Sequence, residues 1–125
     1  MVNWFCRAGV IYAILAMLLG LVMAISGDHS QVTAHAHLNL IGWVGMFLAG
    51  LYYRMVPGAA AGMLPRLHFL AGNIGVVIMV IGLLLIYGGA PRIGVPFASI
   101  GSILSLLATA LFAVVVFRTA PNRAT

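Results

Sequence analysis

Four long apolar segments, separated by short links that contain glycine and proline, dominate the hydrophobic pattern of the chain. They cover about residues 4–25, 33–56, 66–87 and 93–118. Each is close to the ~20 residues that an α-helix needs to cross ~30 Å of hydrocarbon. Because the links are too short to hold a soluble domain, the pattern predicts a single domain over residues 1–125, an all-α bundle of four transmembrane helices.

Composition supports an integral membrane protein. Of the 125 residues, 64% are hydrophobic and 6% are charged, and the mean hydropathy is +1.19. Soluble domains carry about 25% charged residues. The first apolar segment is also longer than the 7–15 residue core of a typical secretory signal, so we expect it to be a retained helix of a multi-pass protein.

The charges predict an orientation. The chain has six arginines, no lysine and one acid, Asp28. If the four helices alternate in direction, Arg92 lies at one end and the other five lie at the opposite end: Arg7, Arg54, Arg66, Arg118 and Arg123. By the positive-inside rule, both termini should face the cytoplasm, with the protein in the inner (plasma) membrane. The arginines are scattered, without a basic run, so we expect no nucleic-acid partner.

The second segment carries the chemistry that stands out, the pair His35-Ala36-His37 at its predicted outer end. Residues two apart on an α-helix point about 200° away from each other, so one regular helix cannot direct both imidazoles at one metal ion. Each histidine therefore needs a partner elsewhere. Ionisable residues within a membrane segment are functional candidates, and the alternative is that both are hydrogen-bonded interfacial anchors.

The sequence around this pair resembles the haem-ligating helices of subunit I of the haem-copper oxidases and nitric oxide reductases. The matching residues are His35-Ala36-His37-Leu38-Asn39-Leu40-Ile41-Gly42-Trp43, followed by Gly45 and Tyr52-Tyr53. The resemblance covers about 20 residues and is otherwise architectural. It implies a family whose large subunit has twelve helices in a pseudo-threefold ring, equal to three four-helix units. In that family the second helix of each unit carries metal-binding histidines near the outer face, and one His-x-His pair serves two cofactors.

A homotrimer of this chain would mimic such a twelve-helix core. Its threefold symmetry would let His35 of one protomer and His37 of the next hold one haem at each interface. Asn39 lies beside the pair, and Gly42 and Gly45 would leave room for the porphyrin. The chain has no Cys-x-x-Cys-His motif, so the expected cofactor is non-covalent haem b. Arg92 is the candidate partner of the haem propionates, as the resemblance also implies, or else an ordinary interfacial cation.

Bis-histidine iron has both axial positions filled, which favours electron transfer over gas binding. We therefore expect an electron carrier, with a quinol or a small redox protein as its exchange partner. The family's copper centre needs three converging histidines, which this sequence does not offer, so we expect no oxygen-reducing site. Two alternatives are a histidine-based module that binds or transports copper or another divalent ion, and a structural subunit of a respiratory complex.

The remaining polar residues have simpler interpretations. His29 and His68 are expected to be interfacial anchors, and Asp28 to be a turn residue. Asn39 and Asn73 can link helices through hydrogen bonds. Ser30 or Thr33 is the expected cap of the second helix.

Overall fold

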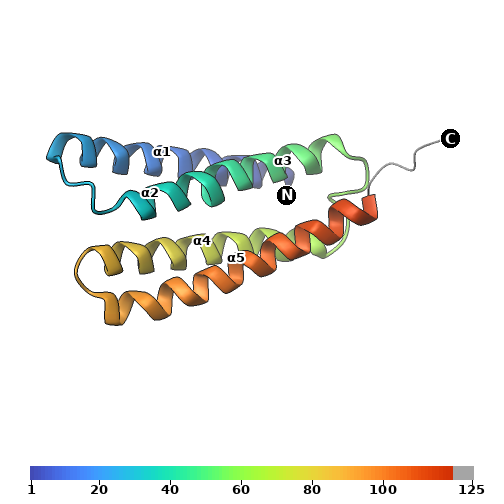
Figure 1. Cartoon of the computed structure of the whole chain (residues 1–125). Helices are drawn as coiled ribbons and strands as arrows, with labels where there is room; N and C mark the ends of the chain where they lie inside the picture. Colours follow the sequence, from blue (N-terminus) through green and yellow to red (C-terminus); the bar gives the residue numbers. More distant parts are fainter. Residues whose placement is uncertain (120–125) are drawn as a thin grey trace.

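The computed structural model describes residues 1–119, and these residues form four membrane-length helical spans (Figure 1). The first span is α1 (Val2–Ser26), and the second is built from α2 (Val32–His37), η1 (Leu38–Gly45) and α3 (Met46–Met55). The third and fourth spans are α4 (Leu64–Tyr87) and α5 (Pro91–Thr119). Each span is long and apolar enough to cross a membrane, which confirms the predicted all-α membrane bundle.

The spans are arranged as two helical hairpins (Figure 1). The first hairpin pairs α1 with the continuous segment α2–η1–α3, and the second pairs α4 with α5. The link between α1 and α2 starts at Gly27, whose φ of 73° is the left-handed conformation that commonly ends helices. Neither Ser30 nor Thr33 caps α2, because Gln31 holds the N-cap position without a side-chain bond. The capping prediction is therefore wrong.

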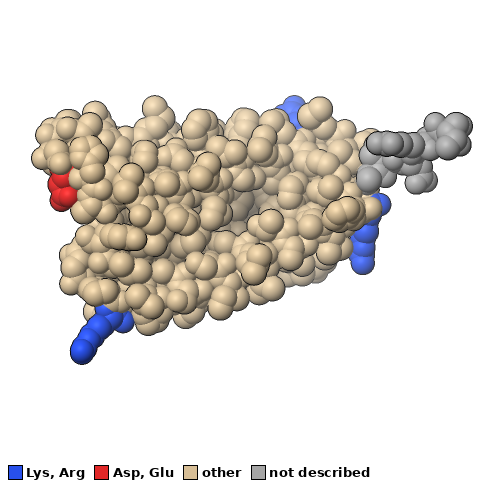
Figure 2. Space-filling view, in the orientation of Figure 1, with Lys and Arg blue, Asp and Glu red and all other residues tan. Residues whose placement is uncertain are grey.

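The charged residues separate between the two ends of the bundle. Arg7, Arg54, Arg66 and Arg118 lie near the ends of α1, α3, α4 and α5 that share one side, whereas Arg92 lies in the first turn of α5 at the other side. Figure 2 shows basic side chains at both ends and acidic atoms at one. Arg123 lies outside the described residues.

The second span is not the regular α-helix that the sequence pattern predicts. Its middle turns, η1, are a π-helix of eight residues in which the backbone bonds reach five residues rather than four. Gly42 lies in this segment, and a Cβ atom there would be 2.9 Å from Cγ of Tyr12. The missing side chain therefore lets η1 pack directly on the Tyr12 ring of α1.

Glycines also bring α4 and α5 into close backbone contact. A Cβ atom on Gly75 would lie 2.8 Å from the backbone nitrogen of Ser105, and one on Gly101 would overlap the backbone of Met79. Lipid tails are as apolar as leucine, so association within the membrane depends on such close packing of small residues. The second hairpin is accordingly a tightly packed unit.

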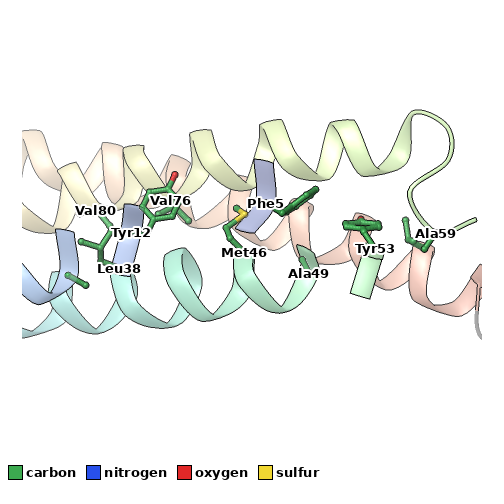
Figure 3. Packing of buried hydrophobic residues seen from close by; sticks show 11 residues of the cluster. Phe5, Tyr12, Leu38, Met46, Ala49, Tyr53, Ala59, Val76 and Val80 are labelled. Atoms are coloured by element: carbon green, nitrogen blue, oxygen red, sulfur yellow. The ribbon is translucent and has the colours of Figure 1, made fainter. Parts of the chain in front are cut away.

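Aromatic packing and hydrogen bonds join the two hairpins. Phe5 of α1 is fully buried, and its ring centroid lies 5.0 Å from those of Tyr53, His68 and Phe69. Figure 3 shows Phe5 and Tyr53 in the core that extends along the bundle. Further along, the Tyr12 hydroxyl donates to Asn73 Oδ1 at 2.8 Å. This bond confirms Asn73 as a link between helices.

The glycine contacts predict which substitutions unfold the protein. Gly101→Leu should lower the free energy of unfolding by at least about 1–3 kcal/mol, because the new side chain has to separate α5 from α4. Reversible unfolding in mixed detergent micelles measures this change. Gly45→Ala is the matched control, since the nearest atom to its Cβ, the carbonyl oxygen of Leu40, is at an ordinary 3.4 Å. An equal loss in both variants would contradict the packing account.

Candidate functional site

His35 and His37 lie half-buried on α2, on either side of its core-facing residues. Ala34 and Leu38 face the interior and are buried. His35 turns toward α1, where its Nδ1 lies 2.9 Å from the carbonyl oxygen of Ala16. His37 instead bonds within its own helix, with Nδ1 2.8 Å from the carbonyl oxygen of Thr33. The two rings are thus held separately by different parts of the chain.

The partner of each ring determines its tautomer. A carbonyl oxygen can only accept a hydrogen bond, so Nδ1 carries the proton in both His35 and His37 when neutral. Nε2 is then the acceptor nitrogen in both rings: that of His37 has no hydrogen-bond partner among the described residues, and that of His35 is 3.4 Å from the Asn39 side-chain nitrogen. The two rings thus share one tautomer, with Nδ1 bonded to the backbone.

The surroundings of His35 are specific to this ring. A Cβ atom on Gly20 of α1 would be 2.8 Å from His35 Cε1, so the glycine makes space for the imidazole. Asn39 Nδ2 lies 3.4 Å from His35 Nε2 and donates a shorter bond, 3.0 Å, to the His35 carbonyl oxygen. Asn39 therefore bonds within its own span, and the expectation that it links two helices is wrong.

The other predicted cofactor residues are separated by the structure. Gly42 faces α1 and is covered by Tyr12, so packing within the chain accounts for its lack of a side chain. Gly45 is exposed on the opposite side of the span. Arg92 is exposed in the first turn of α5, at the same end as the histidine pair. At this end Gly88, which follows α4, lies beside Gln31, since a Cβ on Gly88 would be 3.7 Å from Gln31 Nε2.

Ligand groups are sparse within one chain. Among residues 1–119, no group of three or more His, Cys, Asp and Glu side chains could hold a metal ion. Side chains of these four types therefore do not complete a metal site at His35 or His37 within the described residues. The shared haem and the trimer stay predictions.

A second site lies at the opposite end of the bundle, where sequence interpretation expected only an anchor. His68 is 6% exposed, and it lies inside an aromatic cluster rather than at the membrane interface. Its Nδ1 is 2.9 Å from the Tyr53 hydroxyl, and its ring stacks on Phe112 at 5.0 Å between centroids. The anchor prediction for His68 is wrong because the residue shares a helix face with the buried Gly72 and Gly75. The helical spacing of His68, Gly72 and Gly75 was the feature of the sequence that could have identified His68 as a buried residue.

His68 also borders a groove between the two hairpins, with a cavity volume of about 270 Å³. Figure 2 shows the surface hollowed between the hairpins on this face. The walls come from η1 and α3 on one side and from α4 and α5 on the other. The lining includes Ile41, Gly45, Met46, His68, Ser105 and Thr109. Gly45 therefore opens onto this groove.

The turn between α1 and α2 behaves as expected. Asp28 Oδ1 accepts a hydrogen bond from the Ser30 amide at 2.9 Å. This bond favours the ionised carboxylate and lowers the pKa of Asp28. Asp28 is confirmed as a turn residue, and the exposed imidazole ring of His29 bonds only the Gly27 carbonyl oxygen among the described residues.

Comparison of the chain with protein-family models, with curated proteins and with solved structures finds no match.

The Tyr53–His68 bond predicts a measurable contribution to stability. Tyr53→Phe should lower the free energy of unfolding by about 0.6–1.5 kcal/mol, since the buried imidazole loses its partner in a medium without water. Unfolding in mixed micelles measures the change. Tyr87→Phe, at a site that is 46% exposed, should leave stability within about 0.5 kcal/mol of the parent. Equal effects of the two substitutions would show that the bond is not stabilising.

Proposed function

We propose that this chain is a b-type haem protein that transfers electrons in the membrane, with His35 and His37 as axial ligands supplied by different protomers of a homotrimer. The observation that carries the proposal is the orientation of the two rings. Each donates Nδ1–H to a backbone carbonyl, which leaves the Nε2 lone pair to bind iron once the long 3.4 Å contact of His35 with Asn39 is given up. Interfacial anchors need no such common arrangement.

The placement of the rings on α2 supports ligands from two protomers. His35 bonds to α1 and His37 bonds within its own helix. Because residues two apart on an α-helix point about 200° away from each other, we do not expect their Nε2 atoms to converge on one point within the chain. One chain therefore supplies one ligand on each of two sides. A closed ring of identical chains joins these sides in heterologous pairs, which gives one bis-histidine site for each protomer.

Haem fits this ligand set better than a bare metal ion. Copper or zinc sites made by protein alone need three or four ligands, and the described residues do not gather three. A porphyrin brings four nitrogens of its own, so two histidines complete the coordination. When bound in this way, haem supplies reversible one-electron transfer.

The arginines at the two ends of the bundle support both the expected partner of the haem propionates and the orientation of the protein in the membrane. Arg92 lies at the histidine end, where a guanidinium can hold the propionates in bidentate pairs. Four described arginines lie at the opposite end: Arg7, Arg54, Arg66 and Arg118. By the positive-inside rule we place that end and both termini in the cytoplasm, with the histidine pair toward the outer face of the inner (plasma) membrane.

An absorption spectrum of the purified protein in detergent tests the proposal. A sharp Soret band with reducible α and β bands is expected from low-spin haem with two histidine ligands. A colourless protein containing copper or zinc would instead support a metal-binding or transport module. A colourless protein free of metal would support a structural subunit of a larger complex.

The two ligands are tested one at a time. His35→Ala and His37→Ala should each abolish the low-spin spectrum at every site, because each haem needs one ligand of each type. His29→Ala is the matched control and should keep the parent spectrum, since this exposed ring bonds only the Gly27 carbonyl oxygen among the described residues. Full haem content after either of the first two substitutions would overturn the ligand assignment.

A further inference from the structure

The first turns of α1 carry an arginine that stacks on a tryptophan beside an apolar cleft. The guanidinium carbon of Arg7 lies 5.0 Å from the centre of the Trp4 ring. Both side chains line a cavity of about 560 Å³, whose wall also includes Ala8 and Ile11 of α1 and Phe69 of α4. We call this cavity the Arg7 cleft. It lies at the end of the bundle opposite the histidine pair, and its described lining shares no residue with that of the groove between the hairpins.

The chemistry of the Arg7 cleft changes in one direction along α1. Trp4, Arg7 and Ile11 follow each other at spacings of three and four residues, so they lie on one side of the helix, each about one turn further from its start. Tryptophan is enriched at the membrane–water interface, and an arginine near a helix end extends toward it. Ile11 is 57% exposed and suits hydrocarbon. A phospholipid has the same order, with a phosphate at the interface and acyl chains below it.

No acidic side chain of the chain can neutralise Arg7. The one acid in the sequence, Asp28, follows the other end of α1, about 30 Å away at the rise of an α-helix. Arg66 adds a second positive charge at the same end, because it precedes Phe69 by three residues on the same side of α4. The anion that complements this charge therefore comes from outside the chain.

The charges also distinguish a lipid from a second copy of the chain. A neighbouring copy in the same membrane orientation would carry its Asp28 at the opposite depth, so it would bring no acidic side chain to Arg7. It could cover the apolar wall, but it would leave the guanidinium without an anion. A lipid phosphate lies at the depth of the headgroups and can accept two parallel hydrogen bonds from a guanidinium.

We infer that the Arg7 cleft binds an anionic phospholipid, with the phosphate on Arg7 and an acyl chain along the apolar wall. Stacking on Trp4 restricts the arginine side chain before the lipid arrives, so less conformational entropy is lost on binding. The volume of the cleft is within the range of small-molecule sites. In the orientation proposed above, the cleft faces the cytoplasmic leaflet, which contains anionic lipids.

Trp4 can report on its own lipid neighbours. The chain has two tryptophans, so Trp43→Phe leaves Trp4, which is 56% exposed, as the only one. The full chain is reconstituted in vesicles of phosphatidylcholine and phosphatidylglycerol, in which one of the two lipids carries bromine in the upper half of its acyl chains. Bromine quenches tryptophan fluorescence on contact. Dividing by the intensity in the same vesicles without bromine removes any constant quenching by haem.

We expect the phosphatidylglycerol to be preferred over phosphatidylcholine about five-fold at Trp4, the effect of one basic residue acting on an anionic lipid. Arg7→Gln in the same background should bring the two lipids close to equal quenching. Arg118→Gln is the matched control, because it removes the same charge from the same end of the bundle on α5, outside the lining of the cleft. Both arginines are exposed, so neither substitution should unfold the bundle.

Three results would overturn the inference. Equal quenching by the two brominated lipids in the Trp43→Phe protein would show that the cleft does not select an anionic lipid. An equal loss of preference in Arg7→Gln and Arg118→Gln would assign the effect to the overall charge of this end. Absence of quenching by either lipid would show that another chain covers the cleft. The haem proposal is tested separately, since His37→Ala in the same background should lose haem and keep the lipid preference.

Discussion

Hydrocarbon supplies no hydrogen bonds, and this constraint organises the whole bundle. The backbone satisfies it by forming helices, and the side chains satisfy it by pairing: Tyr12 with Asn73, Tyr53 with His68, and the Nδ1 atoms of His35 and His37 with carbonyl oxygens. Because pairing is the rule, the atoms left without partners carry information. Nε2 of His37 has no hydrogen-bond partner among the described residues and Nε2 of His35 has only the 3.4 Å contact with Asn39, and the haem proposal rests on these two nitrogens.

The histidine pair and the His68 cluster lie at opposite ends of the bundle. The histidine pair lies at the end of α2 that adjoins the α1–α2 turn, and His68 lies in the second turn of α4, at the opposite end. Between them, η1 presents Ile41 and Gly45 to the groove. The π-helical geometry changes the phase of the side chains along this span, and such segments are frequent at functional sites. A single span thus connects the end that bears the histidine pair with the wall of the groove.

The sequence predicted those features for which a residue type has one usual role in a membrane protein. Long apolar runs predicted the four spans, and the position of Asn73 predicted a link between helices. Prediction failed where the outcome depends on tertiary contacts. The contact of Gly42 with the Tyr12 ring across the helix interface has no signal in the sequence. His68 was predicted to be an anchor, but aromatic rings from α1, α3 and α5 enclose it. The spacing of apolar residues in the sequence does not distinguish this π-helix from an α-helix.

Complementation between two inactive chains tests the central claim most directly. Co-expression of His35→Ala and His37→Ala chains in equal amounts lets an intact His35 of one protomer meet an intact His37 of its neighbour. Random mixing in a closed ring should restore low-spin haem at roughly a quarter of the interfaces, while each variant expressed alone has none. A mixed sample that stays colourless, although the parent binds haem, would contradict the sharing of each iron between two protomers.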